Sequence, residues 1–288
     1  MKSLILYFSL LVIPSISCTE YIDIETTDSD SVIAIYGVIT NETAYQWIEI
    51  SRSSSYFDTV PNLFVSGANI TITSLDGKES WTLKERAKGL YRTERRVAGR
   101  VESSYKLNVS CDFNNDGVPE EYHASATILK PFQIDSLKIN SMDLLGRHYF
   151  NILLYAPEPL GTDYYLCKFY INGGLATALI KWYIVINDKL IDGAYLDGLL
   201  IYSFSDQNNE GEYDPGKVLF VKSGDTITVE VNRIDKGYYD FISQCKSSRD
   251  GETPFFGGPP ANIVTNFSPG AVGYFSAYSP ARKSIIVP

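Results

Sequence analysis

Histidine, methionine and positive charge are scarce in this chain. Its 288 residues include two histidines, two methionines and 25 lysines and arginines against 34 aspartates and glutamates, a formal net charge of −9. Because nucleic-acid binding depends on clustered lysine and arginine, we expect no nucleic-acid partner. The sequence also lacks a His-Glu-x-x-His motif, a Gly-x-Ser-x-Gly motif and a glycine-rich phosphate loop. We therefore expect no enzyme and no cofactor.

No apolar run reaches the about 20 residues that a membrane-spanning helix needs. The apolar run Leu4 to Ile13 follows Met1-Lys2 and precedes Pro14-Ser15-Ile16-Ser17, so residues 1–17 are predicted to be an export signal. Cys18 comes next, and two routes are open: ordinary cleavage, or lipoprotein processing that makes Cys18 an acylated N-terminus. The lipobox is imperfect because Ser15 stands where a strong one has leucine.

Cysteine is also sparse, with four residues in the chain. Without Cys18 the odd set Cys111, Cys167 and Cys245 remains, which argues against a disulfide scaffold. One bridge between Cys167 and Cys245 and three buried free thiols are both open.

Aromatic residues, by contrast, make up 13% of the chain and include 21 tyrosines, a composition typical of pleated sheets. Residues 18–30 are predicted to be an acidic tether. An N-terminal β-sandwich is expected over residues 31–130, with the boundary at Lys130-Pro131 because proline cannot donate to a sheet. Alternating patterns predict its strands at residues 31–41, 45–51, 68–73, 81–83, 89–93, 104–111 and 121–128.

A second β-rich domain is expected over residues 131–288. Its predicted strands are residues 133–139, 148–155, 164–172, 178–187, 199–205, 217–222 and 226–234, and later 273–278 and 284–287. Tyr239, Ile242 and Cys245 recur at three-residue spacing, which predicts a short helix near residues 236–248. The fold class is therefore all-β, with two β-sandwich domains and one helix in the second.

One segment resembles part of a calcium loop. Asp112, Asn114 and Asp116 alternate before Gly117, and Glu120 follows, as in the first half of an EF-hand loop. His123 stands where that loop needs a bidentate acid. We therefore favour a hairpin turn over a metal site, because Asp-Gly readily adopts the positive φ angles of tight turns.

The order of several segments resembles a known family. Ile35-Tyr36-Gly37-Val38-Ile39-Thr40-Asn41, Gly89-Leu90-Tyr91 and Ser104-Tyr105-Lys106-Leu107 precede Pro259-Pro260-Ala261-Asn262-Ile263 and Gly273-Tyr274-Phe275-Ser276-Ala277. This order is similar to that of a Bacteroidota lipoprotein family catalogued as the domain of unknown function numbered 4249. The resemblance covers nearly the whole mature chain.

The resemblance implies an outer-membrane lipoprotein, periplasmic or surface-facing, that is anchored in the membrane through lipidated Cys18. It also implies an immunoglobulin-like or transthyretin-like first domain. Bacteroidota glycosylate serine or threonine between aspartate and an aliphatic residue, so the resemblance makes Ser31, Thr59, Ser136 and Thr226 candidates for O-glycosylation.

The expected function is non-enzymatic binding, most plausibly as an accessory to a TonB-dependent receptor, since such receptors are commonly encoded beside members of this family. Two alternatives stay open. One is an enzyme that acts on envelope glycans through two carboxylates, which counting acids does not exclude. The other is a surface antigen that forms a structural coat.

Overall fold

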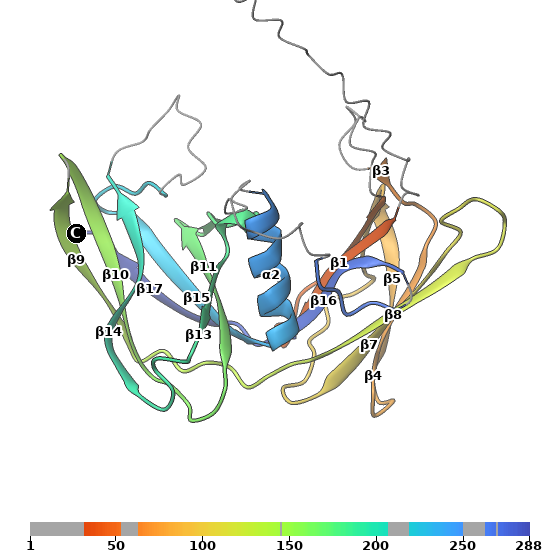
Figure 1. The fold of residues 1–288 in the computed structure, drawn as a ribbon, viewed down its shortest axis with the longest axis horizontal. Coiled ribbons are helices and arrows are strands. Elements are labelled where there is room, and N and C mark those ends of the chain that lie inside the picture. Colours follow the sequence, from red (N-terminus) through yellow and green to blue (C-terminus); the bar gives the residue numbers. More distant parts are fainter. Residues whose placement is uncertain (1–31, 53–62, 145, 207–218, 250–262, 269) are drawn as a thin grey trace, which may run out of the picture. The chain divides into compact units, whose positions relative to one another are not determined.

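The computed structural model describes residues 32–52, 63–144, 146–206, 219–249, 263–268 and 270–288 (Figure 1). These residues form strands in three sheets and one α-helix, so the all-β prediction with one helix is confirmed. In this part of the chain no helix has the length and apolar character needed to cross a membrane.

The first sheet has nine strands around one apolar core. Its order is β16 (Val272–Tyr278), β1 (Ile33–Thr40), β2 (Trp47–Arg52), β6 (Leu90–Thr93), β5 (Ser80–Ala87), β4 (Asn69–Ser74), β7 (Ser104–Cys111) and β8 (Glu120–Thr127), with β3 (Leu63–Phe64) paired to β2. Alternate residues of β1, including Ile33, Ile35 and Ile39, are fully buried in that core. The alternation predicted from the sequence therefore determines which face of each strand is covered.

β16 returns from far along the chain and pairs in parallel with β1. Gly273 permits this pairing, because its φ is +103° and a Cβ atom there would lie 2.0 Å from the carbonyl oxygen of Ile35. Phe275 and Ala277 enter the first core, while Tyr274 and Tyr278 lie on the opposite face, as the alternation within the predicted strand 273–278 requires. The first sheet thus contains a strand from beyond the expected boundary at residue 130.

Residues just before β16 join the two edges of the first sheet. His123 of β8 and Ser268 exchange backbone hydrogen bonds of 3.1 and 3.0 Å. The Asn266 side chain donates to the carbonyl oxygens of Ser125 (3.1 Å) and Phe275 (2.8 Å), and its oxygen accepts from the Phe275 amide (3.0 Å). The sheet is therefore closed around its core.

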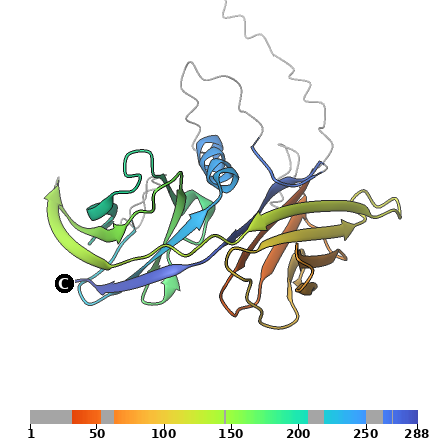
Figure 2. The ribbon, with the colours of Figure 1, turned by 90° about the horizontal axis from the view of Figure 1, so that it is seen from below.

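The second lobe is a pair of sheets around another core. One has the order β14 (Tyr195–Ser205), β10 (Arg147–Pro157), β9 (Ser136–Leu144), and the other has β12 (Gly174–Leu175), β11 (Tyr164–Ile171), β15 (Thr226–Ile234), β17 (Ala281–Ile286), with β13 (Ile184–Asn187) paired to β11. Residues from both sheets, such as Ile152, Phe204 and Val229, make one buried cluster. Figure 2 shows β16 and β17 following one another from the first sheet into this lobe.

Asp235 caps the N-terminus of helix α2 (Lys236–Arg249). Its carboxylate accepts a hydrogen bond of 2.9 Å from the Tyr238 amide. Leu166 of β11, Tyr238 and Ile242 of α2 and Tyr274 of β16 belong to one apolar cluster, onto which Tyr36 and Val38 of β1 pack. The helix therefore contacts both the first sheet and the second lobe (Figure 1).

Two of the local differences from the prediction concern residues 178–187 and 217–222. Residues 178–187 were expected as one strand, but the 3-10 helix η1 (Ile180–Trp182) precedes β13 there. The predicted strand at 217–222 lies partly outside the described residues, and Phe220 makes an isolated bridge to Ser205.

Candidate functional site

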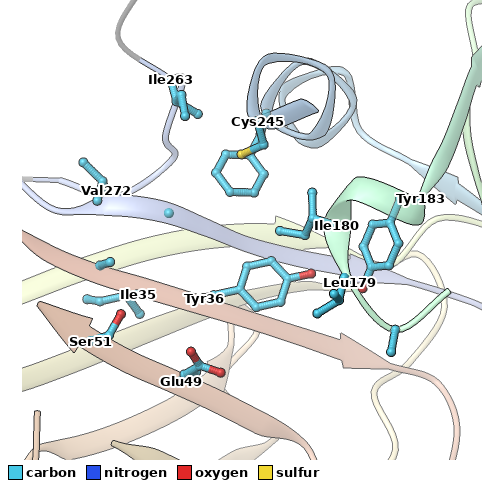
Figure 3. A pocket seen from close by; sticks show the side chains of 14 residues that line it. Ile35, Tyr36, Glu49, Ser51, Leu179, Ile180, Tyr183, Cys245, Ile263 and Val272 are labelled. Carbon is cyan, nitrogen blue, oxygen red and sulfur yellow. The ribbon is translucent and has the colours of Figure 1, made fainter. Parts of the chain in front are cut away.

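A pocket of about 540 Å³ lies where β1, β2 and β16 meet η1 and α2 (Figure 3). Most of its lining is apolar and comes from segments that are distant in sequence. The lining residues are Ala34, Ile35, Tyr36, Glu49, Ser51, Ala178, Leu179, Ile180, Tyr183, Phe241, Cys245, Ile263, Val272 and Gly273. Its size is typical of sites that hold a small molecule.

Tyr36 reaches the pocket because it lies on the face of β1 that points away from the first core. Its hydroxyl forms a 2.6 Å hydrogen bond with the hydroxyl of Tyr238 on α2. Burial raises the pKa of each of these two phenols well above the ordinary value of a tyrosine, so both stay protonated at neutral pH. This pair fixes the direction of the Tyr36 ring.

Tyr183 follows η1 and is 6% exposed. Its backbone is held by two hydrogen bonds, from its amide to the carbonyl of Ile180 (3.0 Å) and from Lys246 Nζ of α2 to its carbonyl (2.9 Å). Among the described residues its hydroxyl has no hydrogen-bond partner, although it lines the pocket. The hydroxyl itself is not fully buried, so it can be reached from the pocket and is available to a ligand.

Lys168 of β11 lies behind the Tyr183 ring. It is 8% exposed, its Nζ donates to the Tyr278 hydroxyl (2.7 Å), and its Nζ lies 4.9 Å from the Tyr183 ring centroid. In the described part of the chain no carboxylate lies within ion-pair distance of it. A buried ammonium against a ring face is a cation–π contact, and its charge strengthens the phenol as a hydrogen-bond donor.

Glu230 carries a compensating negative charge and faces Lys168 across the β11–β15 pair. Glu230 is itself bound by Arg282 at 2.6 Å and accepts a hydrogen bond of 2.8 Å from Tyr170. Arg282 also pairs with Glu42. Charges of opposite sign therefore alternate from Lys168 through Glu230 and Arg282 to Glu42, and the ammonium of Lys168 is bound by a tyrosine hydroxyl and not by a carboxylate.

A carboxylate cluster lies elsewhere, in the loops β10–β11 and β13–β14. Oxygens of Glu158, Asp188 and Asp192 lie within 4.8 Å of one another and could hold a cation. Glu158 accepts from the Tyr165 hydroxyl (2.8 Å) and the Gly193 amide (2.6 Å), and Asp192 accepts from the Gly161 amide (2.8 Å). Because these bonds tie the two loops together, we assign the cluster a structural role.

The weak calcium candidates lie in the turn between β7 and β8. Asp112, Asn114 and Asp116 accept hydrogen bonds from the amides of Gly117 (3.0 Å), Asp116 (3.1 Å) and Val118 (2.8 Å), and Glu120 accepts from the Phe113 amide (2.8 Å). Asn115 and Gly117 have positive φ. The side-chain oxygens are thus engaged by the turn's own backbone, the arrangement that stabilises a hairpin.

The other predicted site residues are not part of the pocket. Cys18, Ser31 and Thr59 lie outside the described residues, while Ser136 and Thr226 begin β9 and β15. Cys111, Cys167 and Cys245 are free thiols, which answers the question that the sequence left open.

Comparison with known proteins defines the family. A family model described as a domain of unknown function (DUF4249) matches residues 19–284. The chain belongs to the DUF4249 family. No curated protein matches this DUF4249 member. The match confirms the family expected from the order of segments, while export, lipidation and the bacterial phylum stay predictions.

Two solved structures show a distant likeness to this DUF4249 chain. One is a two-domain fibronectin type-III segment of chicken tenascin, with 10% identity, a TM-score of 0.19 and coverage of 71% of this chain and 91% of that chain. The other is a Salmonella alpha-2-macroglobulin mutant, with 9% identity, a TM-score of 0.23 and coverage of 96% of this chain and 16% of that chain. At these scores neither carries an argument about function.

Sequence reasoning missed the roles of the pocket residues Tyr36, Tyr183 and Cys245, and of Lys168 behind Tyr183. One signal was present. In β1 the residues between the core isoleucines include Tyr36 and Val38, so the strand is apolar on both faces and a second element must cover it. The sequence did not indicate that this cover is α2.

Proposed function

We propose that this DUF4249 protein is a non-enzymatic binding lipoprotein of the outer membrane, anchored through Cys18 and its acidic tether. In this proposal the pocket between β1, η1 and α2 holds the ligand. The observation that supports it is the hydroxyl of Tyr183, a residue that lines the apolar pocket, because this hydroxyl has no hydrogen-bond partner in the described chain. A small number of unpaired polar groups in an apolar pocket is typical of ligand sites.

The proposed partner is a TonB-dependent receptor, to which the lipoprotein presents its ligand or its loops. This part of the proposal rests on the genomic association of the family and not on a contact in the structure. Affinity purification of the full lipoprotein from detergent-solubilised outer membranes tests it directly. We expect a TonB-dependent receptor to be enriched, and recovery of the lipoprotein alone or of other coat proteins contradicts the receptor proposal.

The anchor is tested by Cys18→Ala. Stable membrane binding requires more than one lipid chain, which an acylated N-terminal cysteine supplies. We expect the variant to move from the membrane fraction to the soluble fraction and to lose the mass of the lipid. Unchanged fractionation, with no lipid mass on the wild-type protein, contradicts the lipoprotein proposal.

A further inference from the structure

We propose that the pocket binds a monocarboxylic acid with a long alkyl chain, its carboxylate at Tyr183 and its chain along the apolar walls. This inference rests on the proposed binding function and names the chemical class of the ligand. In this inference Tyr183 selects the head group of the ligand. Lys168 positions the Tyr183 ring and polarises its hydroxyl.

The apolar walls account for the alkyl chain. Ile35, Ile180, Phe241 and Val272 line the pocket from four different elements, and Leu179 lies among them. Val272 is 40% and Leu179 53% exposed, so apolar surface that a ligand would cover now faces solvent. Each buried methylene group of a ligand contributes about 0.8 kcal/mol of transfer free energy, which favours a long chain over a short one.

The tyrosine hydroxyls at one end of the pocket are the reason for proposing a carboxylate head group. The Tyr183 hydroxyl is an unpaired donor, and the Lys168 ammonium on its ring face makes it a stronger one. The Tyr36 hydroxyl points toward Ile180 and Tyr183 in Figure 3, where it can serve as a second donor. An acceptor with negative charge satisfies these groups, whereas an amine would bring a second positive charge toward Lys168.

Two carboxylates near the site fix the orientation of such a ligand. Glu49 lines the pocket beyond the opposite end of the Tyr36 side chain (Figure 3), so repulsion disfavours a carboxylate there. Glu230 lies behind Lys168 and is already bound by Arg282. The head group is therefore expected at the tyrosine end.

The test compares three probes that share one alkyl chain and differ in the head group, namely decanoate, decanol and decylamine. Binding is measured by calorimetry on the full chain carrying Cys18→Ala, which avoids detergent. We expect decanoate to bind at least tenfold more tightly than decanol, and decylamine to bind most weakly. Equal affinities, tighter binding of decylamine, or no binding of decanoate overturns the proposal.

A matched pair of variants locates the head group. Tyr183→Phe removes only the hydroxyl that we assign to the ligand, so decanoate should bind at least tenfold more weakly while decanol changes less. Tyr239→Phe is the control, because the Tyr239 hydroxyl accepts a hydrogen bond from Asn187 (3.1 Å) and does not line the pocket. Equal losses in both variants overturn the assignment of Tyr183.

Cys245 reports where the alkyl chain of the ligand binds, since its thiol lines the pocket. Saturating decanoate should slow alkylation of Cys245 in the full chain carrying Cys18→Ala, measured by peptide mass spectrometry, and leave the rates at buried Cys111 and Cys167 unchanged. Unprotected Cys245 at saturation places the ligand elsewhere. Because this assay needs no receptor, failure to recover a receptor and failure to bind decanoate are separate results.

Discussion

The hydroxyl of Tyr105 joins parts of the first sheet that are distant in the chain. It accepts a hydrogen bond from the Arg100 amide (2.7 Å) and donates to Glu79 Oε2 (2.5 Å), and the ring stacks on Trp81 with centroids 5.4 Å apart. Tyr105→Phe keeps the stacking but leaves the Arg100 amide without its acceptor, while Glu79 loses one of its two donors and keeps Arg100 Nε (3.2 Å). We expect a loss of about 1–3 kcal/mol in the free energy of unfolding, measured by urea denaturation.

Tyr195→Phe is the control for that measurement, because Tyr195 is 56% exposed and water can replace its hydrogen bond to Asp135. A change within about 0.5 kcal/mol is expected there. Similar losses in both variants would show that the Tyr105 hydroxyl contributes nothing particular to the sheet.

Asp116 is predicted to stabilise a turn and not to bind calcium. Its Oδ1 atom accepts a hydrogen bond from the Val118 amide (2.8 Å), and its amide donates to Asn114 (3.1 Å). Asp116→Ala should therefore lower stability by about 1 kcal/mol through loss of a local hydrogen bond. Thermal unfolding with and without millimolar calcium checks this, and a calcium-induced rise in Tm that disappears in the variant would identify a metal site instead.

At the scale of elements, β16 holds the first sheet together. Phe275 is fully buried in the first core, and the Tyr274 hydroxyl donates to Asp235 (2.6 Å) at the start of α2. Phe275→Ala should cost about 3–5 kcal/mol, and truncation before Gly273 should give insoluble protein because the closing strand is lost. Chemical denaturation and the soluble yield measure these effects.

Val272→Ala is the matched control in the same strand, since Val272 is 40% exposed and its truncation should cost far less. If the truncated protein stays folded and monomeric but no longer binds its partner, β16 is a docking element and its structural assignment is wrong.

At the scale of the whole molecule, buried thiols and phenols predict that the folded state loses stability at alkaline pH. Burial raises the pKa of Cys111 to about 11, of Cys167 to about 12 and of Tyr170 to about 12. In the unfolded chain, thiols titrate near pH 8.5 and phenols near pH 10, so the unfolded state loses these protons first. The stability contributed by the neutral groups is full below about pH 8.5 and is lost as pH rises through the folded values.

The expected result is a free energy of unfolding that is constant near neutrality and falls above about pH 9, by up to about 1.4 kcal/mol per pH unit for each such group. Urea denaturation at about pH 7.5, 9.5 and 10.5 measures it, with absorbance at 295 nm as a record of phenolate formation. Cys167→Ala should flatten the decline, and a stability that rises with pH would contradict the argument.

Much of the fold was determined by local sequence. The alternation in β1, β4 and β7 fixed both the strands and their buried faces, and Asp235 with the apolar spacing of residues 239–245 fixed the helix. Phe275 was placed in the core and Tyr274 opposite for the same reason. A strand or helix has a period of only a few residues, so its covered face can be read from neighbours along the chain.

The site was decided only by tertiary structure. β16 pairs with β1 although more than two hundred residues separate them in the sequence, and Tyr36, Lys168, Tyr183 and Tyr278 come from four different segments. No local pattern specifies which distant strand completes a sheet. Packing of α2 against both β11 and β16 brings these segments together, and the unpaired Tyr183 hydroxyl exists only because of that packing.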